Sequence, residues 1–360
     1  MSKERNNKLL KMVDKYIGIP LVYSLGMFHK KKKLPVDINY IGVLATAAIG
    51  DTIIMSSAIN DIKNKYPNSH IVLFCGSSNY EVAKLLQNID KIEKLPIKNI
   101  IKSKKIIQSY KFDIWVDFGP WPRLNSLLTY LSNAKYKIGF FTQKQYRHYI
   151  YDNYVIHSDD IHEYKNYCNL IKLFNITKFT LPNIILNSIS ENKKEYIVCH
   201  MFAGGSKANL KELLLEQWYY IITYLQNLDY NIYLTGAPAD FERIDEFINK
   251  YNLDINNMAG KLSLKETAVL IKEAKLTISI DTGIMHLASA LKVSLVAIHG
   301  PTSPERWGSL SKNTISIYLN KNCAPCISLG FESNCNNNIC IKEITQDMIN
   351  TTIDKALKGL

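Results

Sequence analysis

The fold of this chain is decided by the stretch Ile278-Ser279-Ile280-Asp281-Thr282-Gly283-Ile284-Met285-His286-Leu287-Ala288. Residues 276–280 are apolar and β-branched, as in a central parallel strand, and apolar residues then recur at helical spacing. The first turn of a helix has unpaired N–H groups and a partial positive charge, and Gly283 lets a ligand approach the backbone. This junction predicts a binding site for a phosphate or diphosphate, although an ordinary capped helix start has the same pattern.

Two other junctions between a strand and a helix repeat this arrangement. The apolar run 40–44 leads to Gly50 and Asp51 and to a helix that ends before Pro67. The run 196–200 leads to Gly204-Gly205-Ser206-Lys207, which is a weak signal for a phosphate-binding loop. Neither the dinucleotide fingerprint G-x-G-x-x-G nor the Walker pattern occurs, which counts against a dehydrogenase and a P-loop NTPase.

Strands and helices are predicted to alternate along both halves of the chain. Strands are expected at 40–44, 70–74, 113–117, 196–200, 231–235, 276–280, 294–298 and 314–319. Helices are expected at 51–65, 79–88, 162–174, 215–227, 240–250, 264–274, 284–291 and from Ile344 onward. Such alternation is typical of parallel sheets that bind ligands at the carboxyl ends of their strands. A globular composition, with 47% hydrophobic and 21% charged residues over 360 positions, favours two domains.

Five separated blocks of the chain resemble glycosyltransferase family 9, the ADP-heptose:lipopolysaccharide heptosyltransferases. The blocks are Ala48–Asp51; His200 with Lys211, Glu216 and Trp218; Thr235–Pro238 with Ala259–Leu264; Asp281–Gly283 with His286; and Gly300–Pro304. Their order and spacing are similar to the family's from residue 39 to residue 345. The resemblance implies the α/β fold called GT-B, in which two Rossmann-like domains with parallel sheets face each other across a cleft.

The resemblance also implies a division of the chain. A basic N-terminal extension is expected at 1–38, an acceptor domain at 39–185, a nucleotide-sugar domain at 186–345 and a C-terminal helix at 346–360. The implied activity is that of an inverting glycosyltransferase, which transfers a heptose from ADP-heptose to a lipopolysaccharide or lipooligosaccharide core acceptor. No catalytic cofactor is expected, since no metal-binding D-x-D element stands beside the donor loops.

The family's site residues are carried over by motif. Asp51 matches the base that deprotonates the acceptor hydroxyl, and Lys211 matches the cation that stabilises the leaving diphosphate. The expected nucleotide-sugar contacts are Gly204, Gly205, Ser206, Asp240 at the ribose, Leu262 at the adenine, Asp281, Thr282, Gly283 and His286. The expected acceptor contacts are Gly50 and Arg123.

The chain departs from the family pattern in two places. Leu213-Leu214 stands where a Trp-Pro pair usually follows the lysine, so Lys207 competes with Lys211 for the diphosphate. The loop 45–48 lacks the basic residue and serines of many members, so acceptor recognition can differ. The alternatives are a transferase that uses another nucleotide sugar for a different surface glycan, a sugar-nucleotide epimerase of this fold, and a non-catalytic nucleotide-sugar-binding protein. Asp51 argues against the last, because a binding protein needs no base.

The N-terminal 40 residues contain nine Lys or Arg residues and three acidic residues. Their excess of positive charge is half of the net charge of +12. The apolar segment Val22–Phe28 precedes Lys30–Lys33, a pattern typical either of contact with an anionic membrane surface or of a solvated charge run. No basic and aromatic residues interleave as in nucleic-acid binders. Without a secretion signal or an apolar run of about 20 residues, the expected location is the cytoplasm, with peripheral contact to the inner face of the inner membrane.

Four of the seven cysteines lie within 18 residues of a polar loop: Cys323, Cys326, Cys335 and Cys340. A C-x-x-C pair with two more thiols can hold zinc or iron tetrahedrally in a structural site. Disulfides and free thiols are the alternatives, and cytoplasmic disulfides are rare. Cys75, Cys168 and Cys199 stand in apolar contexts and are expected in the core.

Overall fold

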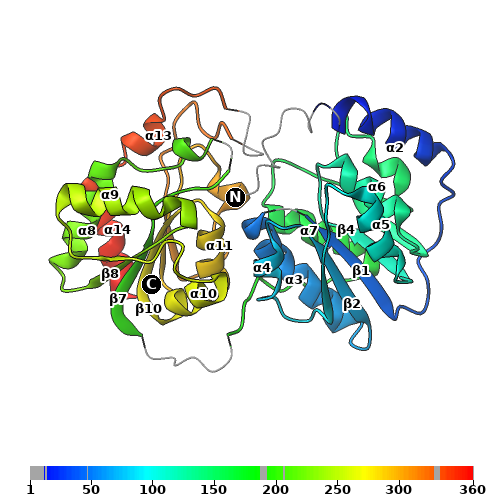
Figure 1. The fold of residues 1–360 in the computed structure, drawn as a ribbon, viewed down its shortest axis with the longest axis horizontal. Helices are drawn as coiled ribbons and strands as arrows, with labels where there is room; N and C mark the ends of the chain where they lie inside the picture. The colour runs from blue at the N-terminus through cyan, green and yellow to red at the C-terminus, as the bar shows by residue number, and fades with distance from the viewer. Residues whose placement is uncertain are drawn as a thin grey trace. The chain divides into compact units, whose positions relative to one another are not determined.

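The computed structural model describes residue 12 and residues 14–46, 48–186, 193–205, 207–327 and 333–359. Contacts divide the chain into two compact units, one up to Leu181 and one from Pro182 onward (Figure 1). Each unit contains one six-stranded sheet in which the paired strands are parallel. Within the described part of the chain, no helix is long and apolar enough to cross a membrane.

The sheet of the first unit has the strand order β3-β2-β1-β4-β5-β6. Its strands are β1 (Tyr40–Ala45), β2 (His70–Cys75), β3 (Lys91–Lys94), β4 (Ile114–Asp117), β5 (Tyr136–Phe141) and β6 (Asn153–Ile156). Its helices are α2 (Gly18–Met27), α3 (Ile49–Lys65), α4 (Tyr80–Ala83), α5 (Ile100–Gln108), α6 (Arg123–Leu131) and α7 (Glu163–Ile171), with 3-10 turns η1 (Arg147–Ile150) and η2 (Lys172–Phe174). In Figure 1, α3 and α4 lie on one side of the sheet and α5 and α6 on the other.

The sheet of the second unit has the order β12-β11-β10-β7-β8-β9. Its strands are β7 (Lys194–His200), β8 (Asn231–Thr235), β9 (Asn256–Asn257), β10 (Ala274–Ile280), β11 (Leu295–Ile298) and β12 (Thr314–Ile317). Its helices are α8 (Leu215–Gln226), α9 (Phe241–Tyr251), α10 (Leu264–Glu273), α11 (Gly283–Ala290), α12 (Pro304–Trp307), α13 (Ile339–Lys342) and α14 (Gln346–Lys358), with 3-10 turns η3 (Ala208–Leu210) and η4 (Pro238–Asp240). The C-terminal α14 packs on α8, β11 and β12.

Counted within each unit, both sheets have the strand order 3-2-1-4-5-6 of a Rossmann fold. This confirms the predicted α/β class. The central strands are buried along nearly their whole length, over 41–45 in β1 and 276–280 in β10, because helices cover both faces of a parallel sheet. Gly42 in β1 permits tight packing here, since a Cβ at this position would lie 2.5 Å from the ring of Trp115 on β4.

The sequence predicted the central strands and the edge strand β12, and it missed the other three edge strands. β3, β5, β6 and β9 were not expected, and neither were α5, α6 and α13. Three of these strands, β3, β6 and β9, are edge strands and carry polar residues, so they lack a continuous apolar run. The helix expected at 79–88 is wrong in length, since α4 ends at Ala83. The helix expected at 162–174 changes to a 3-10 turn after Ile171, and α14 begins at Gln346 with Thr345 as its N-cap.

Candidate active site

The strand order reverses between β1 and β4 in the first unit and between β7 and β10 in the second, and open α/β sheets bind ligands at the carboxyl ends of the strands at such points. In the second unit, His200 ends β7 and Asp281 follows β10 directly. The pairing of Ser279 with His200 brings these two strand ends side by side. The motifs predicted from separate parts of the sequence therefore meet at one edge of this sheet.

Asp281 is the centre of a buried polar group in the second unit. Lys211 Nζ lies 2.8 Å from Asp281 Oδ2, and the Thr302 hydroxyl donates to the same oxygen at 2.6 Å. Burial by itself would raise the pKa of the Asp281 carboxyl, but the Lys211 ammonium, the nearby His299 and the two hydrogen bonds hold that pKa well below its usual range. Asp281 is therefore ionised at neutral pH, and Lys211 supplies the positive charge beside it.

The helix α11 begins next to Asp281. Thr282 is its N-cap, and the Thr282 hydroxyl oxygen accepts a hydrogen bond from the N–H of Ile284 at 3.2 Å. Gly283 is the first residue of the helix, and His286 is buried one turn later. An eight-residue helix that starts beside the Lys211–Asp281 pair brings the positive end of its dipole close to a lysine, an arrangement that suits a diphosphate.

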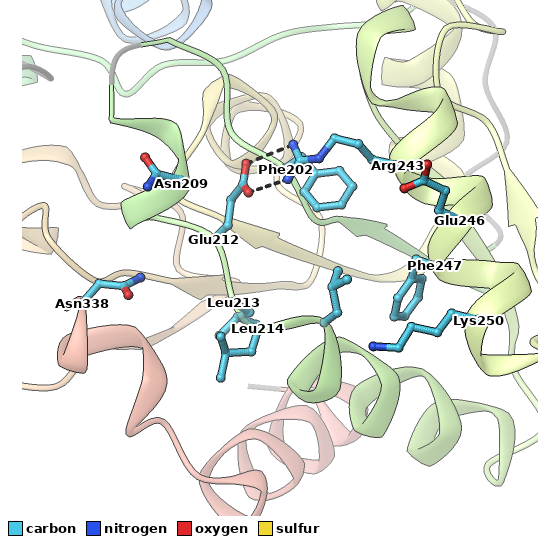
Figure 2. Close-up of a pocket in the computed structure, with 11 residues that line it drawn as sticks. Phe202, Asn209, Glu212, Leu213, Leu214, Arg243, Glu246, Phe247, Lys250 and Asn338 are labelled. Atoms are coloured by element: carbon cyan, nitrogen blue, oxygen red, sulfur yellow. Dashed lines mark hydrogen bonds and ion pairs between the residues drawn. The ribbon is translucent and has the colours of Figure 1, made fainter. Parts of the chain in front are cut away.

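The loop after β7 carries Lys211 and is held from two sides. Glu212 accepts a hydrogen bond from the N–H of Ala203 at 3.1 Å and pairs with Arg243 of α9 at 2.7 Å. The Arg243 guanidinium also lies over the Phe202 ring, 3.7 Å from its centroid. Figure 2 shows this pair in a pocket of about 380 Å³ that Leu213, Leu214 and Phe247 also line.

Several other predicted donor residues lie on loops at this sheet edge. Gly205 has a φ of 98°, which favours glycine, and Ser206 lies outside the described residues. Asp240 accepts a hydrogen bond from the N–H of Ala237 at 2.8 Å. The loop after β8 contacts the loop that leads to Leu262, since Gly260 N–H donates to the Gly236 carbonyl at 3.1 Å. These positions are compatible with a nucleotide site, and the role of each residue stays a prediction.

Two histidines lie at the same edge, and only His299 was missed by the sequence analysis. His200 was named only as part of the family resemblance, and its Nδ1 lies 3.0 Å from the Thr235 hydroxyl while burial lowers its pKa to about 4. His299 follows β11 and is fully buried. Among the described residues, neither ring nitrogen of His299 has a hydrogen-bond partner. The signal for His299 was its position, directly after an apolar strand and before the Gly300-Pro301 turn.

In the first unit, Asp51 lies in the first turn of α3. Its carboxylate accepts a hydrogen bond from the N–H of Ala48 at 3.0 Å, and Gly50 beside it is buried. The buried Asn79 amide donates at 2.9 Å both to the Ala45 carbonyl and to the Thr52 hydroxyl. The end of β1 and the start of α3 are thus fixed to each other, which holds the Asp51 carboxylate at the carboxyl edge of the sheet.

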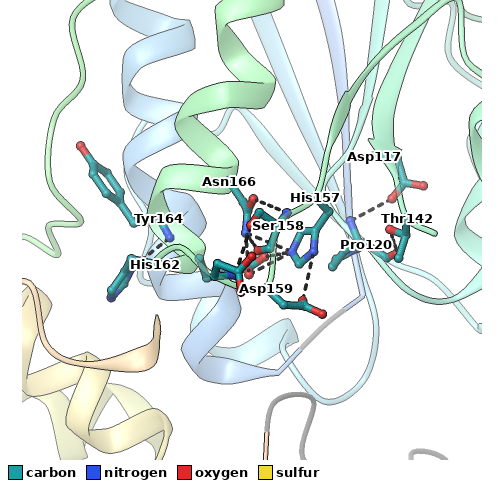
Figure 3. Close-up of polar contacts among 12 residues, drawn as sticks. Asp117, Pro120, Thr142, His157, Ser158, Asp159, His162, Tyr164 and Asn166 are labelled. Atoms are coloured by element: carbon teal, nitrogen blue, oxygen red, sulfur yellow. Dashed lines mark hydrogen bonds and ion pairs between the residues drawn. The ribbon is translucent and has the colours of Figure 1, made fainter. Parts of the chain in front are cut away.

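Other polar residues at this edge hold the loops after β4, β5 and β6 (Figure 3). Asp117 accepts a hydrogen bond from Gly119 N–H at 2.9 Å and pairs with the buried Arg147. His157 Nε2 lies 3.0 Å from both carboxylate oxygens of Glu163, at the start of α7. These residues were not predicted from the sequence, because single polar residues at or after a strand end form no motif.

Arg123 is the first residue of α6 and is buried. A side chain that contacts an acceptor would be expected to be exposed. The Arg123 guanidinium binds the Asp14 carboxylate and, at 3.3 Å, the Gln145 carbonyl. Contact of Arg123 with an acceptor stays a prediction, and it requires that the Asp14 carboxylate gives up this cation.

The four-cysteine loop is near α13 in the second unit. Cys340 is buried, Cys323 is exposed, and Cys326 and Cys335 are intermediate. The pKa of Cys340 is raised to about 11, first by burial and then by the neighbouring thiols of the other three. Over the described ranges, no three His, Cys, Asp or Glu side chains are placed to hold a metal ion. The donor chemistry fits zinc or iron, but the side chains are not arranged as a metal site, so the expected metal is not supported.

Comparison with known proteins identifies the family. Residues 126–335 match the model of glycosyltransferase family 9 (heptosyltransferase). The chain belongs to glycosyltransferase family 9.

Curated heptosyltransferases match different shares of the chain. Lipopolysaccharide heptosyltransferase 2 of Salmonella typhimurium is 35% identical over 99 residues, which are 26% of this chain and only 28% of that protein. Lipopolysaccharide core heptosyltransferase OpsX of Haemophilus influenzae is 23% identical over 296 residues, covering 77% of this chain and 84% of that one.

Solved structures share the fold. The E. coli ADP-heptose lipopolysaccharide heptosyltransferase II has a TM-score of 0.72 at 17% identity, with 89% of this chain and 98% of that chain covered. The iron-containing dodecameric glycosyltransferase TibC of enterotoxigenic E. coli has a TM-score of 0.59 at 13% identity, with 91% and 78% covered. The first of these likenesses confirms the GT-B fold expected from the sequence.

Proposed function

We propose that this protein is an inverting glycosyltransferase that transfers a heptose from ADP-heptose to a lipopolysaccharide or lipooligosaccharide core acceptor. The observation that carries the proposal is the Lys211–Asp281–Thr302 group beside the start of α11. It combines a cation and free helix N–H groups at the carboxyl edge of a Rossmann sheet, where nucleotides bind. Family membership supplies the transferase chemistry.

In the proposed reaction, an acceptor hydroxyl oxygen attacks the anomeric carbon of the donor sugar. The bond from that carbon to the diphosphate oxygen breaks, and its electron pair leaves with ADP. Attack from the face opposite the leaving group inverts the configuration. Asp51 takes the proton of the acceptor hydroxyl, while Lys211 and the first N–H groups of α11 stabilise the negative charge that develops on the diphosphate.

The remaining donor contacts are proposed from the loops around this group. Asp240 binds the ribose and Leu262 packs against the adenine. Gly204, Gly205 and Ser206 bring backbone N–H groups to the phosphates, and His286 contributes from α11. Gly50 and Arg123 contact the acceptor in the other unit.

Contact with an anionic membrane surface is part of the proposal, and α2 supports it. Gly18 and Val22 face inward, and a Cβ on Gly26 would lie 2.3 Å from that of Tyr149, so this side of the helix is packed against η1. Away from this contact, the helix and its two flanking residues expose large apolar side chains: Ile17, Leu21, Met27 and Phe28. Lys30–Lys33 follow and are exposed too, so apolar and basic side chains lie together as they do in helices at the membrane interface.

A structural metal at the four-cysteine loop is retained as a proposal. Its support is the set of four thiols in one loop, together with the iron-containing TibC of the same fold. No step of the transfer reaction involves it.

A donor carrying another sugar is the second candidate, favoured by Leu213-Leu214 and by the loop 45–48, which depart from the family pattern. The experiment that tests both is a donor screen by mass spectrometry with deacylated core oligosaccharides. Transfer from ADP-heptose supports the first candidate, and transfer from a different nucleotide sugar supports the second. Absence of donor turnover above a buffer control would leave a non-catalytic binding protein.

A further inference from the structure

His299 is a buried titratable side chain that the proposed reaction does not use. Its residue exposure is 0%, its two ring nitrogens lack hydrogen-bond partners among the described residues, and its backbone N–H is fixed to the Ile317 carbonyl at 2.9 Å. The charged groups that face it are Asp281 after β10, Lys211 in the loop after β7, and Glu305 in α12. A buried imidazole with free nitrogens beside an ion pair can gain or lose a proton without rearranging other hydrogen bonds.

The charge balance around Asp281 depends on Lys211. Thr302 is neutral, so the Lys211 ammonium is the cation that binds the Asp281 carboxylate. The Lys211 side chain is 19% exposed, whereas that of Asp281 is 6% exposed and His299 is inaccessible. Of these groups, Lys211 is the one that can reach an incoming anion from solvent. When it does so, the buried carboxylate is left without its cation, which is costly.

We propose that Lys211 leaves Asp281 for the diphosphate of the donor, and that His299 takes up one proton from solvent and replaces it as the cation beside Asp281. The inference rests on the proposed function, because it assumes that a nucleoside diphosphate binds at Lys211. His299 is a positioning residue in this account: it keeps Asp281 compensated and in place while Lys211 is engaged with the phosphates.

The electrostatics of the free protein are compatible with this exchange. Burial lowers the pKa of His299, and Asp281 opposes that effect while Lys211 reinforces it. The imidazole is therefore neutral near pH 7 when Lys211 is paired with Asp281. Departure of Lys211 removes a lowering influence and leaves the raising effects of Asp281 and Glu305, and bound phosphate adds a further negative charge.

The exchange has a measurable consequence in proton linkage. If His299 is neutral in the free protein and protonated in the complex, ADP binding takes up a proton between the two pKa values. In that range the Kd for ADP rises about tenfold for each pH unit of increase. His299→Gln keeps a polar side chain that cannot titrate and should remove this dependence.

The experiment is calorimetric titration of the full chain with ADP at pH 7 in phosphate and in Tris, whose ionisation enthalpies differ. On binding ADP, we expect the wild type to take up close to one proton more than His299→Gln does. Protonation of ADP itself contributes equally to both proteins and therefore cancels in this difference. His70→Asn, a change of a partly exposed histidine in the other unit, is the matched control and should behave as the wild type. A thermal melt checks folding, and His299→Phe serves as a second variant.

Equal proton uptake by the wild type and by both folded His299 variants would overturn the exchange while leaving the proposed function intact. Failure of the wild type to bind ADP would instead contradict the proposed function, and this inference with it.

Discussion

Lys211 Nζ lies 2.8 Å from Asp281 Oδ2, which ties the loop after β7 to the end of β10. The pair lies where the strand order of the second sheet reverses, beside the start of α11. It therefore has two expected functions at once: it stabilises the unit, and it supplies a cation for a nucleoside diphosphate.

Lys211→Met should lower both stability and ADP affinity. The substitution leaves the Asp281 carboxylate buried without its cation, which costs about 3–5 kcal/mol of unfolding free energy. The cost should shrink below pH 7, because a protonated His299 can replace the lost charge.

Urea unfolding and ADP titration measure the effects of Lys211→Met on stability and on ADP affinity. Lys207→Met, on the same loop, is the control, and it should change stability by no more than about 0.5 kcal/mol. If Lys207→Met weakens ADP binding and Lys211→Met does not, the diphosphate contact belongs to Lys207.

His200 makes stability depend on pH. Burial lowers its pKa from an ordinary 6.5 to about 4, so the folded protein holds the imidazole neutral while the unfolded chain protonates it below pH 6.5. The stabilising effect is fully present above pH 6.5 and is lost as the pH falls toward 4, by up to about 3 kcal/mol at 1.36 kcal/mol per pKa unit. His200→Asn should flatten the stability profile over this range in urea titrations. A profile as steep as that of the wild type would mean that the imidazole is not held neutral.

Asp51→Asn should abolish transfer while leaving the donor bound. The amide keeps the shape and can still accept the hydrogen bond from Ala48, but it cannot take a proton. Loss of a general base lowers kcat by about 100- to 10,000-fold. The measurements are kcat with a soluble acceptor and the Kd for ADP. Asp229→Asn, which makes the same chemical change in a turn of the other unit, should keep full activity. A kcat for Asp51→Asn close to the wild type would remove this carboxylate from the mechanism.

The exposed side of α2 and the lysines after it should bind anionic vesicles. Reversal of Lys30–Lys33 to glutamate should remove most of the binding, since each basic residue near such a surface contributes about 1 kcal/mol. Phe28→Ser should weaken binding further by removing apolar area. Sedimentation with phosphatidylglycerol vesicles at low salt measures both changes. Ile101→Ser changes another exposed apolar residue, on α5, and should have no effect. Vesicle binding by the glutamate variant equal to that of the wild type would refute the membrane contact.

The four-cysteine loop should hold one metal ion per chain if the retained proposal is correct. Elemental analysis of protein purified without added metal is the direct measurement. Cys326→Ser should then lower the Tm more than it lowers kcat, because the loop contributes no group to the reaction. Less than about 0.2 equivalents of zinc and iron together, with four titratable thiols under native reducing conditions, would exclude the site. The alternative is a loop without metal, in which the four cysteines are free thiols and Cys340 is buried.

The sequence was sufficient for the parts of the fold that rest on continuous burial. β1 and β10 are buried on both faces, so their apolar runs are unambiguous, and the motifs that follow them mark the carboxyl edges. β3 and β6 were missed because exposed edge strands are short and mixed in character. Contacts between residues that are distant in the sequence were also not predicted. The hydrogen bond from Thr302 to Asp281 spans 21 positions and depends on the strand order of the folded sheet. His299 and His157 carry no motif, and only the folded sheet shows what lies beside them.

The central claim is tested most directly by incubating the full chain with ADP-heptose and a deacylated core oligosaccharide, and weighing the products by mass spectrometry. The account predicts an acceptor heavier by one heptose residue and an equal amount of released ADP. It also predicts inversion at the anomeric carbon, so that a β-linked donor gives an α linkage and an α-linked donor gives a β linkage. No heavier acceptor and no ADP above the Asp51→Asn variant, from protein that binds ADP, would contradict it.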